Sequence, residues 1–405
     1  MPDLDIDFIR RQFPAFSEPS LQGQAFFENA GGSYACGPVI ERLSRYYHQR
    51  KVQPYYPFEA SRLAGEEMDE ARARISALLN IKADELSFGP STTQNTYVLA
   101  QAFGQMLAEG DAIIVTNQDH EANTGPWRRL AARGIELREW QVDASGHLDP
   151  QDLSNLLDDK VKLVCFPHCS NIVGEVNPVA ELARLVRAAG AYACVDGVSM
   201  APHGLPDIGG LGVDIYLFSA YKTYGPHQGI MYVNRALADV LPNQAHYFNA
   251  GERYKRFTPA GPDHAQIAAC AGMADYIDAV HAHHFAAEPD AAARGRAVAG
   301  LQRDHEANLL GPLLDYLKGR NDVRLLGPGT GRVPTVALEA ARPGYELASA
   351  LAPLGIMAGG GDFYAGRLLK ALGVNLDHGA LRLSFVHYTS AAEITQLTEA
   401  LDKVL

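Results

Sequence analysis

The sequence has little cysteine and no long uninterrupted apolar run, and these two features exclude several classes of protein. Five cysteines among 405 residues are too few and too dispersed for a disulfide framework. No run approaches the about 18 apolar residues of a membrane-spanning helix, and the first residues carry acids where a signal peptide would be apolar. We therefore expect a cytoplasmic protein with no membrane partner, in which Cys165 and Cys194 are buried thiols and Cys36 is structural.

Several ligand-binding motifs are also missing. The phosphate-loop pattern GxxxxGK[ST] does not occur, and the glycine-rich run at 327–332 lacks the strand-then-helix context of a dinucleotide loop, so it predicts a hairpin turn. The histidines at 281–284 have no carboxylate or cysteine at a matching spacing, and we expect no metal. A net charge of −12, with acids and bases interspersed, disfavours nucleic acid as a partner.

What the chain does contain is enough apolar sequence for a large α/β fold. Its hydrophobic content is 47%, and its length suggests two or three domains. Apolar runs at 161–166 and 191–196 flank a helical segment at 178–189, which predicts a βαβ unit and hence a parallel sheet. From about residue 290 shorter strands and helices follow, which indicates a separate C-terminal α+β domain.

Two of the predicted strands end in residues of opposite charge. The run that starts at Asp214 ends at Lys222, and the run before it ends at Asp196. Ligands of open α/β sheets bind at the carboxyl ends of the strands. Pyridoxal phosphate needs a lysine for a Schiff base and an acid that keeps its ring nitrogen protonated. The alternative is a solvated lysine and an ordinary Asp-Gly turn.

The segments VDGVSMAPH at 195–203 and DIYLFSAYKTYGPH at 214–227 resemble the class V aminotransferase family of fold-type I enzymes, especially its cysteine desulfurase and selenocysteine lyase branch. The resemblance implies a large domain at 23–286, with a mostly parallel seven-stranded sheet between helices, and a small α+β domain at 287–405. It also implies that residues 1–22 form an arm packing with the small domain. A homodimer with the active site at the subunit interface is expected.

The same resemblance assigns the residues that bind pyridoxal 5'-phosphate. His120 would stack on the ring, and Asn171 would bind the phenolate oxygen. Thr92 and Thr93 open a helix whose N-terminus suits a phosphate, although capping the helix is an alternative role. Gly261 would reach the phosphate of the neighbouring subunit. The cofactor-binding set is Thr92, Thr93, His120, Asn171, Asp196, Ser199, Ser219, Tyr221, Lys222 and Gly261, and the catalytic residues are Lys222, His120 and Asp196.

Other segments resemble the family's substrate-binding parts, which implies a small-molecule amino-acid substrate. Arg382 lies in an alternating strand whose family counterpart holds the substrate carboxylate, and its guanidinium matches a carboxylate bidentately. The alternative is a surface arginine on an edge strand. Ala30 and Gly31 lie in a run similar to the family's substrate loop, or in a plain Gly-Gly turn. Tyr364 is a further candidate for substrate contact.

One departure from the family bears on the reaction. Desulfurases carry an Arg-x-Gly-x-x-Cys loop with the sulfur-accepting cysteine, whereas residues 359–364 read GGGDFY, so no persulfide can form there. The leading hypothesis is a β-elimination lyase that works without a protein persulfide. A transaminase or an epimerase is the alternative, and a silent pyridoxal-phosphate-binding protein is the non-enzyme alternative.

Two further predictions concern a helix and an aromatic loop. A helix is expected over 363–372, with Asp362 orienting the substrate or contributing to the helix cap. The aromatic residues Tyr55, Tyr56 and Phe58 are expected either to line a substrate mouth or to pack the helices on either side of their loop.

Overall fold

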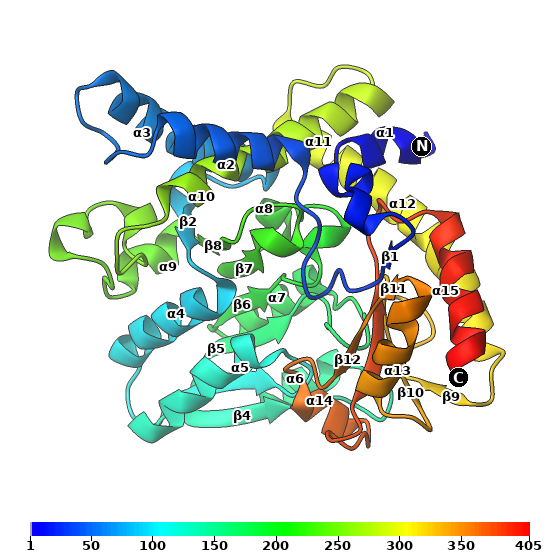
Figure 1. Ribbon diagram of the computed structural model, residues 1–405. Coiled ribbons are helices and arrows are strands. Elements are labelled where there is room, and N and C mark those ends of the chain that lie inside the picture. Colours follow the sequence, from blue (N-terminus) through cyan, green and yellow to red (C-terminus); the bar gives the residue numbers. More distant parts are fainter. Residues whose placement is uncertain (1) are drawn as a thin grey trace.

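The structure is a computed structural model that describes residues 2–405. A large sheet covered by helices fills one side of the molecule, and a smaller sheet with its own helices fills the other (Figure 1). Strand order in the large sheet is β2-β8-β7-β6-β5-β3-β4, with β8 antiparallel to both of its neighbours and the other pairs parallel. This confirms the mostly parallel seven-stranded sheet. Its strands are β2 (Leu86–Gly89), β3 (Ala112–Thr116), β4 (Glu136–Trp140), β5 (Val161–Pro167), β6 (Tyr192–Asp196), β7 (Ile215–Ser219) and β8 (Gly229–Val233).

Both faces of this sheet are buried. In β5, Val164 and Phe166 join one apolar cluster, while Leu163 and Cys165 join a second cluster on the opposite face. Burial on both faces explains why the strands are almost continuously apolar in sequence. One cluster includes residues of α3 (Glu59–Leu78), α7 (Val179–Ala188), α10 (His264–Ala269) and α11 (Ala271–His284); the other includes residues of α4 (Thr92–Met106), α5 (Glu121–Arg128) and α9 (Arg235–Val240).

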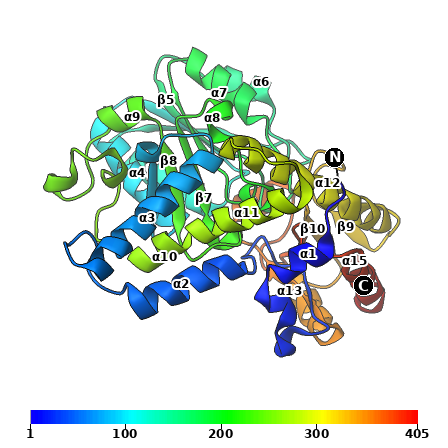
Figure 2. The same cartoon turned by 90° about the horizontal axis from the view of Figure 1, so that it is seen from above.

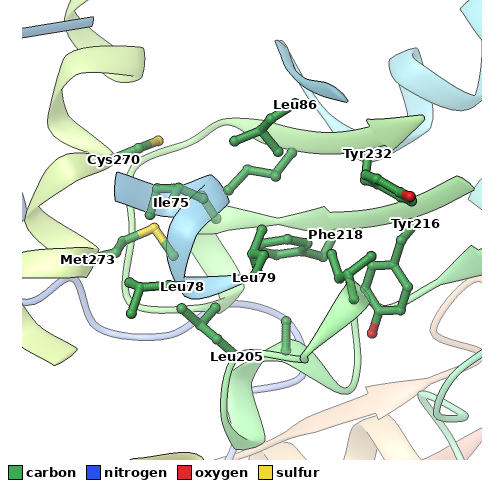
Figure 3. Close-up of a cluster of buried hydrophobic side chains, with 14 of the residues drawn as sticks. Ile75, Leu78, Leu79, Leu86, Leu205, Tyr216, Phe218, Tyr232, Cys270 and Met273 are labelled. Carbon is green, nitrogen blue, oxygen red and sulfur yellow. The ribbon is translucent and has the colours of Figure 1, made fainter. Parts of the chain in front are cut away.

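Helix α3 is attached to the sheet through a dense apolar contact. Figure 3 shows Ile75, Leu78 and Leu79 facing Phe218 of the sheet and Met273 of α11. Each of these side chains, once fully buried, contributes about 1.5–3 kcal/mol. Helix α2 (Gly37–Gln49) runs beside α10 and α11 across the same face (Figure 2).

The smaller sheet has strand order β12-β13-β10-β9 and is antiparallel throughout. Strands β9 and β10 pair directly, which confirms the hairpin turn predicted for 327–332. Its elements are β9 (Val323–Leu325), β10 (Thr335–Ala340), β12 (Gly359–Gly361), β13 (Ala380–Ser384), α12 (Ala291–Lys318), α13 (Gly344–Leu351), α14 (Gly366–Ala371) and α15 (Ala391–Val404).

The N-terminal part of the chain contacts both sides of the molecule. Strand β1 (Ala25–Phe26) pairs in parallel with β11 (Ile356–Met357) beside the smaller sheet. Before it, in the segment that contains α1 (Ile6–Arg11), the Phe13 ring lies 4.8 Å from Tyr388 and 5.2 Å from Tyr276, centroid to centroid. The segment before β1 therefore packs between the side of the large sheet and the side of the small sheet.

The histidines at the end of α11 bind this segment. His283 stacks on Phe8 at 3.9 Å and its Nε2 lies 2.9 Å from Asp5 Oδ2, while His284 Nε2 accepts from the Asp5 backbone N–H at 3.0 Å. These histidines have a structural role that their sequence spacing did not predict.

One local prediction is wrong. The helix expected over 363–372 begins only at Gly366, because Phe363 (φ 51°) and Tyr364 (φ 55°) adopt left-handed backbone conformations. Tyr56 and Phe58 do not pack between helices of their own chain, since both are more than half exposed, and their place at a substrate mouth stays a prediction. Tyr55 is also exposed but lies against Gly65 of α3. None of the helices within residues 2–405 combines the length and hydropathy needed to cross a membrane.

Candidate active site

The candidate active site lies where the central strands of the large sheet end. Strands β5, β6 and β7 are parallel neighbours, so the residues that follow them meet at one edge of the sheet. The N-termini of α4 and α5 close the same space, which we call the inner cavity. It is lined by every predicted cofactor-binding residue except Gly261, namely Thr92, Thr93, His120, Asn171, Asp196, Ser199, Ser219, Tyr221 and Lys222.

Gly261 lies elsewhere, in a hollow lined by residues that include Pro90, Asn95 and His227. Its backbone is therefore not part of the inner cavity of its own chain. The expected contact with a neighbouring subunit's phosphate stays a prediction.

Lys222 is the amine of the inner cavity and is only 9% exposed. Loss of hydration on burial lowers the pKa of Lys222 to about 8, and the positive charge of Arg382 acts in the same direction. The carboxylates of Asp196 and Glu28 oppose this shift. A substantial fraction of the amine is consequently neutral near pH 8, as a nucleophile or a base requires.

Asp196 lies at the end of β6 and accepts a hydrogen bond from the Val198 N–H at 2.8 Å. Burial raises the pKa of Asp196 to about 6, against the effects of that N–H and of Lys222. The nearby Asp119 is more deeply buried, and burial together with the charge of Asp196 raises the pKa of Asp119 well above its ordinary value. Burial and the charge of Asp196 therefore both favour the neutral form of Asp119. The sequence analysis did not select Asp119, although it directly precedes His120.

The opposite end of the inner cavity is suited to an anion. Ser91 caps α4 by accepting from the Gln94 N–H at 3.2 Å, and the hydroxyls of Thr92 and Ser219 lie 2.8 Å apart. Gly229 lets β8 approach this helix end, since a Cβ at that position would lie 2.8 Å from the Thr92 nitrogen. Free amide donors and the helix dipole both favour a phosphate there.

His120 is held as a neutral ring. Its Nδ1 accepts from the Ala122 N–H at 3.0 Å, which caps α5 and leaves the ring proton on Nε2. Burial, with the charges of Lys222 and Arg382, lowers the pKa of His120 to about 3. An uncharged flat ring suits contact with an aromatic ligand.

Asn171 joins the inner cavity to a second, outer cavity. Its Nδ2 donates to the Phe363 carbonyl at 3.1 Å, while its Oδ1 is buried without a partner in the described chain. The free Oδ1 can accept from a donor group of a ligand, while the second N–H of Nδ2 is available for an acceptor. The carboxylate, the amine, the flat ring and the anion-binding helix end together match what pyridoxal phosphate presents.

The outer cavity contains the predicted substrate residues. It shares Thr93, His120, Asn171, Tyr221 and Lys222 with the inner cavity and adds Ala30, Gly31, Tyr364 and Arg382. Its lining also includes residues that the sequence analysis did not select: Glu28, Tyr97, Glu121, Arg129 and Phe363.

Phe363 and Tyr364 form a strained wall of this outer cavity. Both have left-handed backbones, and the Glu121 N–H donates to the Tyr364 carbonyl at 2.8 Å. With the bond from Asn171, two segments of the large side hold this loop of the small side in place. Such strain persists only where surrounding contacts fix it and is concentrated at functional sites.

Arg382 is not a surface arginine. It is 3% exposed, its Nη1 donates to the Asn171 carbonyl at 3.2 Å, and its guanidinium carbon lies 3.9 Å from the centre of the Phe363 ring. Its Nη2 donates to Glu28 Oε1 at 2.5 Å. A planar, oriented guanidinium beside Lys222 is suited to a carboxylate ligand.

Comparison with known proteins agrees with this geometry. The family described as Aminotransferase class-V matches residues 25–397. An aminotransferase-like protein of Gibberella zeae is 32% identical over 417 residues, which cover 99% of this chain and 98% of the relative. A cysteine desulfurase of Serratia proteamaculans is 28% identical over 98% of both chains.

Solved structures share the fold. A cysteine desulfurase from Thermococcus onnurineus NA1 has a TM-score of 0.86 at 23% identity and covers 100% of this chain, with 98% of its own length matched. A cysteine desulfurase from Escherichia coli has a TM-score of 0.83 at 22% identity, with 100% and 99% covered. The match extends over nearly the whole sequence and fold, and the chain belongs to the class V aminotransferase family of pyridoxal-phosphate-dependent enzymes.

Proposed function

We propose that the protein is a pyridoxal-phosphate-dependent lyase that eliminates a β-substituent from an amino acid without forming a protein persulfide. The observation that carries this proposal is the composition of the loop at 359–364. In the desulfurase branch the corresponding loop holds the sulfur-accepting cysteine, whereas here Phe363 and Tyr364 face the outer cavity. The five cysteines are all buried in the described chain.

The residues of the inner cavity have complementary roles toward the coenzyme. Lys222 would hold it covalently, Asp196 would pair with its ring nitrogen, and His120 would cover one face of the ring. Asn171 would contact the phenolate oxygen, and the start of α4 with Ser219 would hold the phosphate. When bound, the coenzyme supplies an electron sink for the pair released at Cα of an amino acid.

The chain's own groups would then bind the substrate and move its protons. Lys222, with a pKa of about 8, is positioned to accept the Cα proton once it is free. Arg382 would bind the α-carboxylate through its guanidinium fork. Tyr364, which is 73% exposed at the mouth, would contact the β-substituent.

Transamination is the second candidate, and it is favoured by one observation. The relative that is 32% identical is named an aminotransferase-like protein. A transaminase would use the same residues but return the proton to a different carbon and require a keto acid as the amino acceptor.

Absorbance of the purified protein with pyridoxal phosphate, measured at about 300–500 nm, separates these candidates. We expect a visible band that persists when a β-substituted alanine such as L-cysteine or β-chloroalanine is added, with release of pyruvate and ammonia. Conversion of the band to that of the pyridoxamine form, without pyruvate, would support transamination. A protein that forms no visible band would contradict both candidates.

We further propose a homodimer with the active site close to the subunit boundary. Exposed aromatic side chains support it: Tyr56, Phe58, Tyr247 and Phe248 are all more than half exposed. Phe248 and Gly261 also line one surface hollow beside these loops. Apolar patches of this kind mark interfaces. Light scattering at micromolar concentration should give twice the chain mass, and a monomer would contradict the proposal.

A further inference from the structure

Arg382, the side chain expected to bind the substrate carboxylate, already has a carboxylate partner. Glu28 Oε1 accepts from Arg382 Nη2 at 2.5 Å, and the Glu28 side chain remains 28% exposed toward the outer cavity. Arg382 Nε is buried and has no partner among the described residues. One side of the guanidinium is therefore occupied by an anion from the protein, and one donor is still unused.

The backbone leaves room for this carboxylate at two positions. A Cβ at Gly31 would lie 2.6 Å from Glu28 Oε1, and a Cβ at Gly359 would lie 2.9 Å from Glu28 Oε2. The two glycines come from the loop after β1 and from β12, on opposite ends of the sequence. Glu28 Oε2 is buried there without a hydrogen-bond partner in the described chain.

These contacts do not give the pair an optimal geometry. A satisfied buried ion pair would use both carboxylate oxygens and the parallel guanidinium donors. Here Glu28 Oε2 and Arg382 Nε are both unsatisfied, although they belong to the two partners of one ion pair. A contact that leaves buried polar atoms unpaired on both partners is easier to exchange for a better one.

We propose that Glu28 is a specificity-determining residue that occupies Arg382 in the resting site and is displaced by the carboxylate of the incoming substrate. This inference rests on the proposed function in one respect, namely that the ligand is an amino acid. An α-amino acid would bind only when the Glu28–Arg382 pair opens. A primary amine without a carboxylate would bind with the pair closed, because Arg382 is then already neutralised.

Competition of this kind lowers affinity by a predictable factor. If Arg382 is free of Glu28 for only about 1–10% of the time, the apparent affinity for a carboxylate ligand falls about 10- to 100-fold. Two carboxylates at one buried cation would also repel each other. The same pair leaves the affinity for an uncharged substituent unchanged, so Glu28 sets the preference between the two ligand classes.

The alternative to competition is a structural role, in which Glu28 only holds Arg382 in position. In that case, removing its charge would leave carboxylate binding unchanged or weaken it, because Arg382 would lose a support. The two roles therefore predict opposite signs for the same substitution.

Glu28→Gln tests the sign, since glutamine keeps the shape of the side chain and removes its charge. With the coenzyme-loaded protein, spectral titration should show tighter binding of L-alanine by about tenfold or more, and binding of ethylamine unchanged within about twofold. Glu339→Gln removes a glutamate that pairs with Arg324 at 2.7 Å on the outside of the small sheet, and it should change neither affinity.

Calorimetric titration of propanoate into the protein without coenzyme gives a second readout. Glu28→Gln should bind propanoate more tightly than the wild type by a similar factor, and Glu28→Asp, whose shorter carboxylate reaches Arg382 poorly, should show an intermediate gain. If either reconstituted alanine binding or propanoate binding is unchanged or weaker in Glu28→Gln, the competition is wrong and Glu28 is a support for Arg382.

These readouts separate the inference from the proposed function. A wild-type protein that forms no visible band with pyridoxal phosphate would contradict the proposed function, while the propanoate titration would still decide the role of Glu28. If Glu28→Gln fails to fold, as judged by thermal melting, the propanoate affinity of Glu28→Asp decides: a gain supports competition, and no gain overturns it.

Discussion

The inner and outer cavities are built in different ways, although they share Lys222 and His120. The inner cavity is made from the ends of adjacent strands of one sheet and from two helix N-termini packed on it, and most of its polar groups, such as Asp196, Ser219 and Lys222, are buried. The outer cavity joins segments from both ends of the sequence, such as Glu28 and Arg382, which are 354 residues apart. The inner cavity, proposed to hold the coenzyme, thus depends on one sheet and its helices, whereas the outer cavity depends on contacts between segments that are distant in sequence.

Lys222→Ala should have the largest effect, because Lys222 lines both cavities. We expect loss of the visible coenzyme band and a fall in turnover of at least about 10³-fold, because both the covalent attachment and the base are lost. The substitution removes a buried charge but also three methylene groups, so these opposing effects should leave the thermal melting temperature little changed. Lys162→Ala, at a half-buried position on β5 where the amine lies 3.8 Å from Asp111 and outside both cavities, is the control. A variant that keeps the band would show that Lys222 does not hold the coenzyme.

Arg382→Lys should affect the outer cavity without disturbing the inner one. A lysine keeps the charge but loses the guanidinium fork. Loss of a charge-assisted hydrogen bond worth about 1.5–3 kcal/mol should raise KM for an amino acid about 10- to 100-fold. The coenzyme spectrum should be unchanged, and Arg367→Lys, an exposed arginine near Glu121, should behave as wild type. Equal losses of coenzyme and substrate affinity would mean that the two cavities are not separable.

Thr92→Val should produce a smaller change at the anion-binding end. The hydroxyl that lies 2.8 Å from Ser219 is lost while the helix N-terminus remains. We expect the coenzyme Kd, measured by fluorescence titration, to rise about fivefold to tenfold, equivalent to about 1 kcal/mol. Thr96→Val lies one turn further along α4, where the hydroxyl bonds only to the Thr92 carbonyl, and should leave this Kd unchanged. A similar rise in both variants would indicate damage to the helix instead.

The smallest expected effect is a pH dependence. Because the pKa of Lys222 is about 8 in the folded protein and 10.5 ordinarily, its neutral fraction should rise about fivefold from pH 7 to pH 8. Coenzyme capture by the coenzyme-free protein, followed by stopped-flow absorbance, should accelerate accordingly. A midpoint near pH 10 in the pH dependence of the capture rate would contradict the lowered pKa of Lys222.

The same shift affects stability with a defined sign. Below pH 8 both states are protonated at Lys222, and burial of its charge destabilises the folded protein. Between about pH 8 and pH 10.5 the unfolded chain binds more protons than the folded one, so this group's contribution to the free energy of unfolding increases with pH. The Lys222→Ala variant should lose that increase.

The sequence predicts candidate residues of both cavities, but it does not predict the contacts between distant segments that shape the outer cavity. The grouping of Asp196 with Lys222 can be inferred from the sequence, because both follow apolar runs and parallel strands bring their carboxyl ends to one edge of the sheet. The ion pair between Glu28 and Arg382 cannot be inferred from the sequence, since many other acids and arginines along the chain are equally plausible partners. The helix predicted from residue 363 is wrong because contacts from Glu121 and Asn171, distant in sequence, hold the carbonyls of Tyr364 and Phe363. The aromatic loop at 55–58 gives no local signal that distinguishes exposure from burial.

The pairing of β2 with β8 has a consequence for biosynthesis. Gln228 Nε2 donates to the Gly89 carbonyl across 139 residues, so β2 has no partner when it leaves the ribosome. At a synthesis rate of about 5–20 residues per second, β8 is made roughly 7–30 s after β2. Arg382 follows Glu28 by 354 residues, a delay of about 20–70 s at the same rate. A nascent chain can therefore complete the strands of its inner cavity well before Arg382 joins the outer cavity. If the inner cavity holds the coenzyme as proposed, early capture would stabilise a chain that cannot yet turn over substrate.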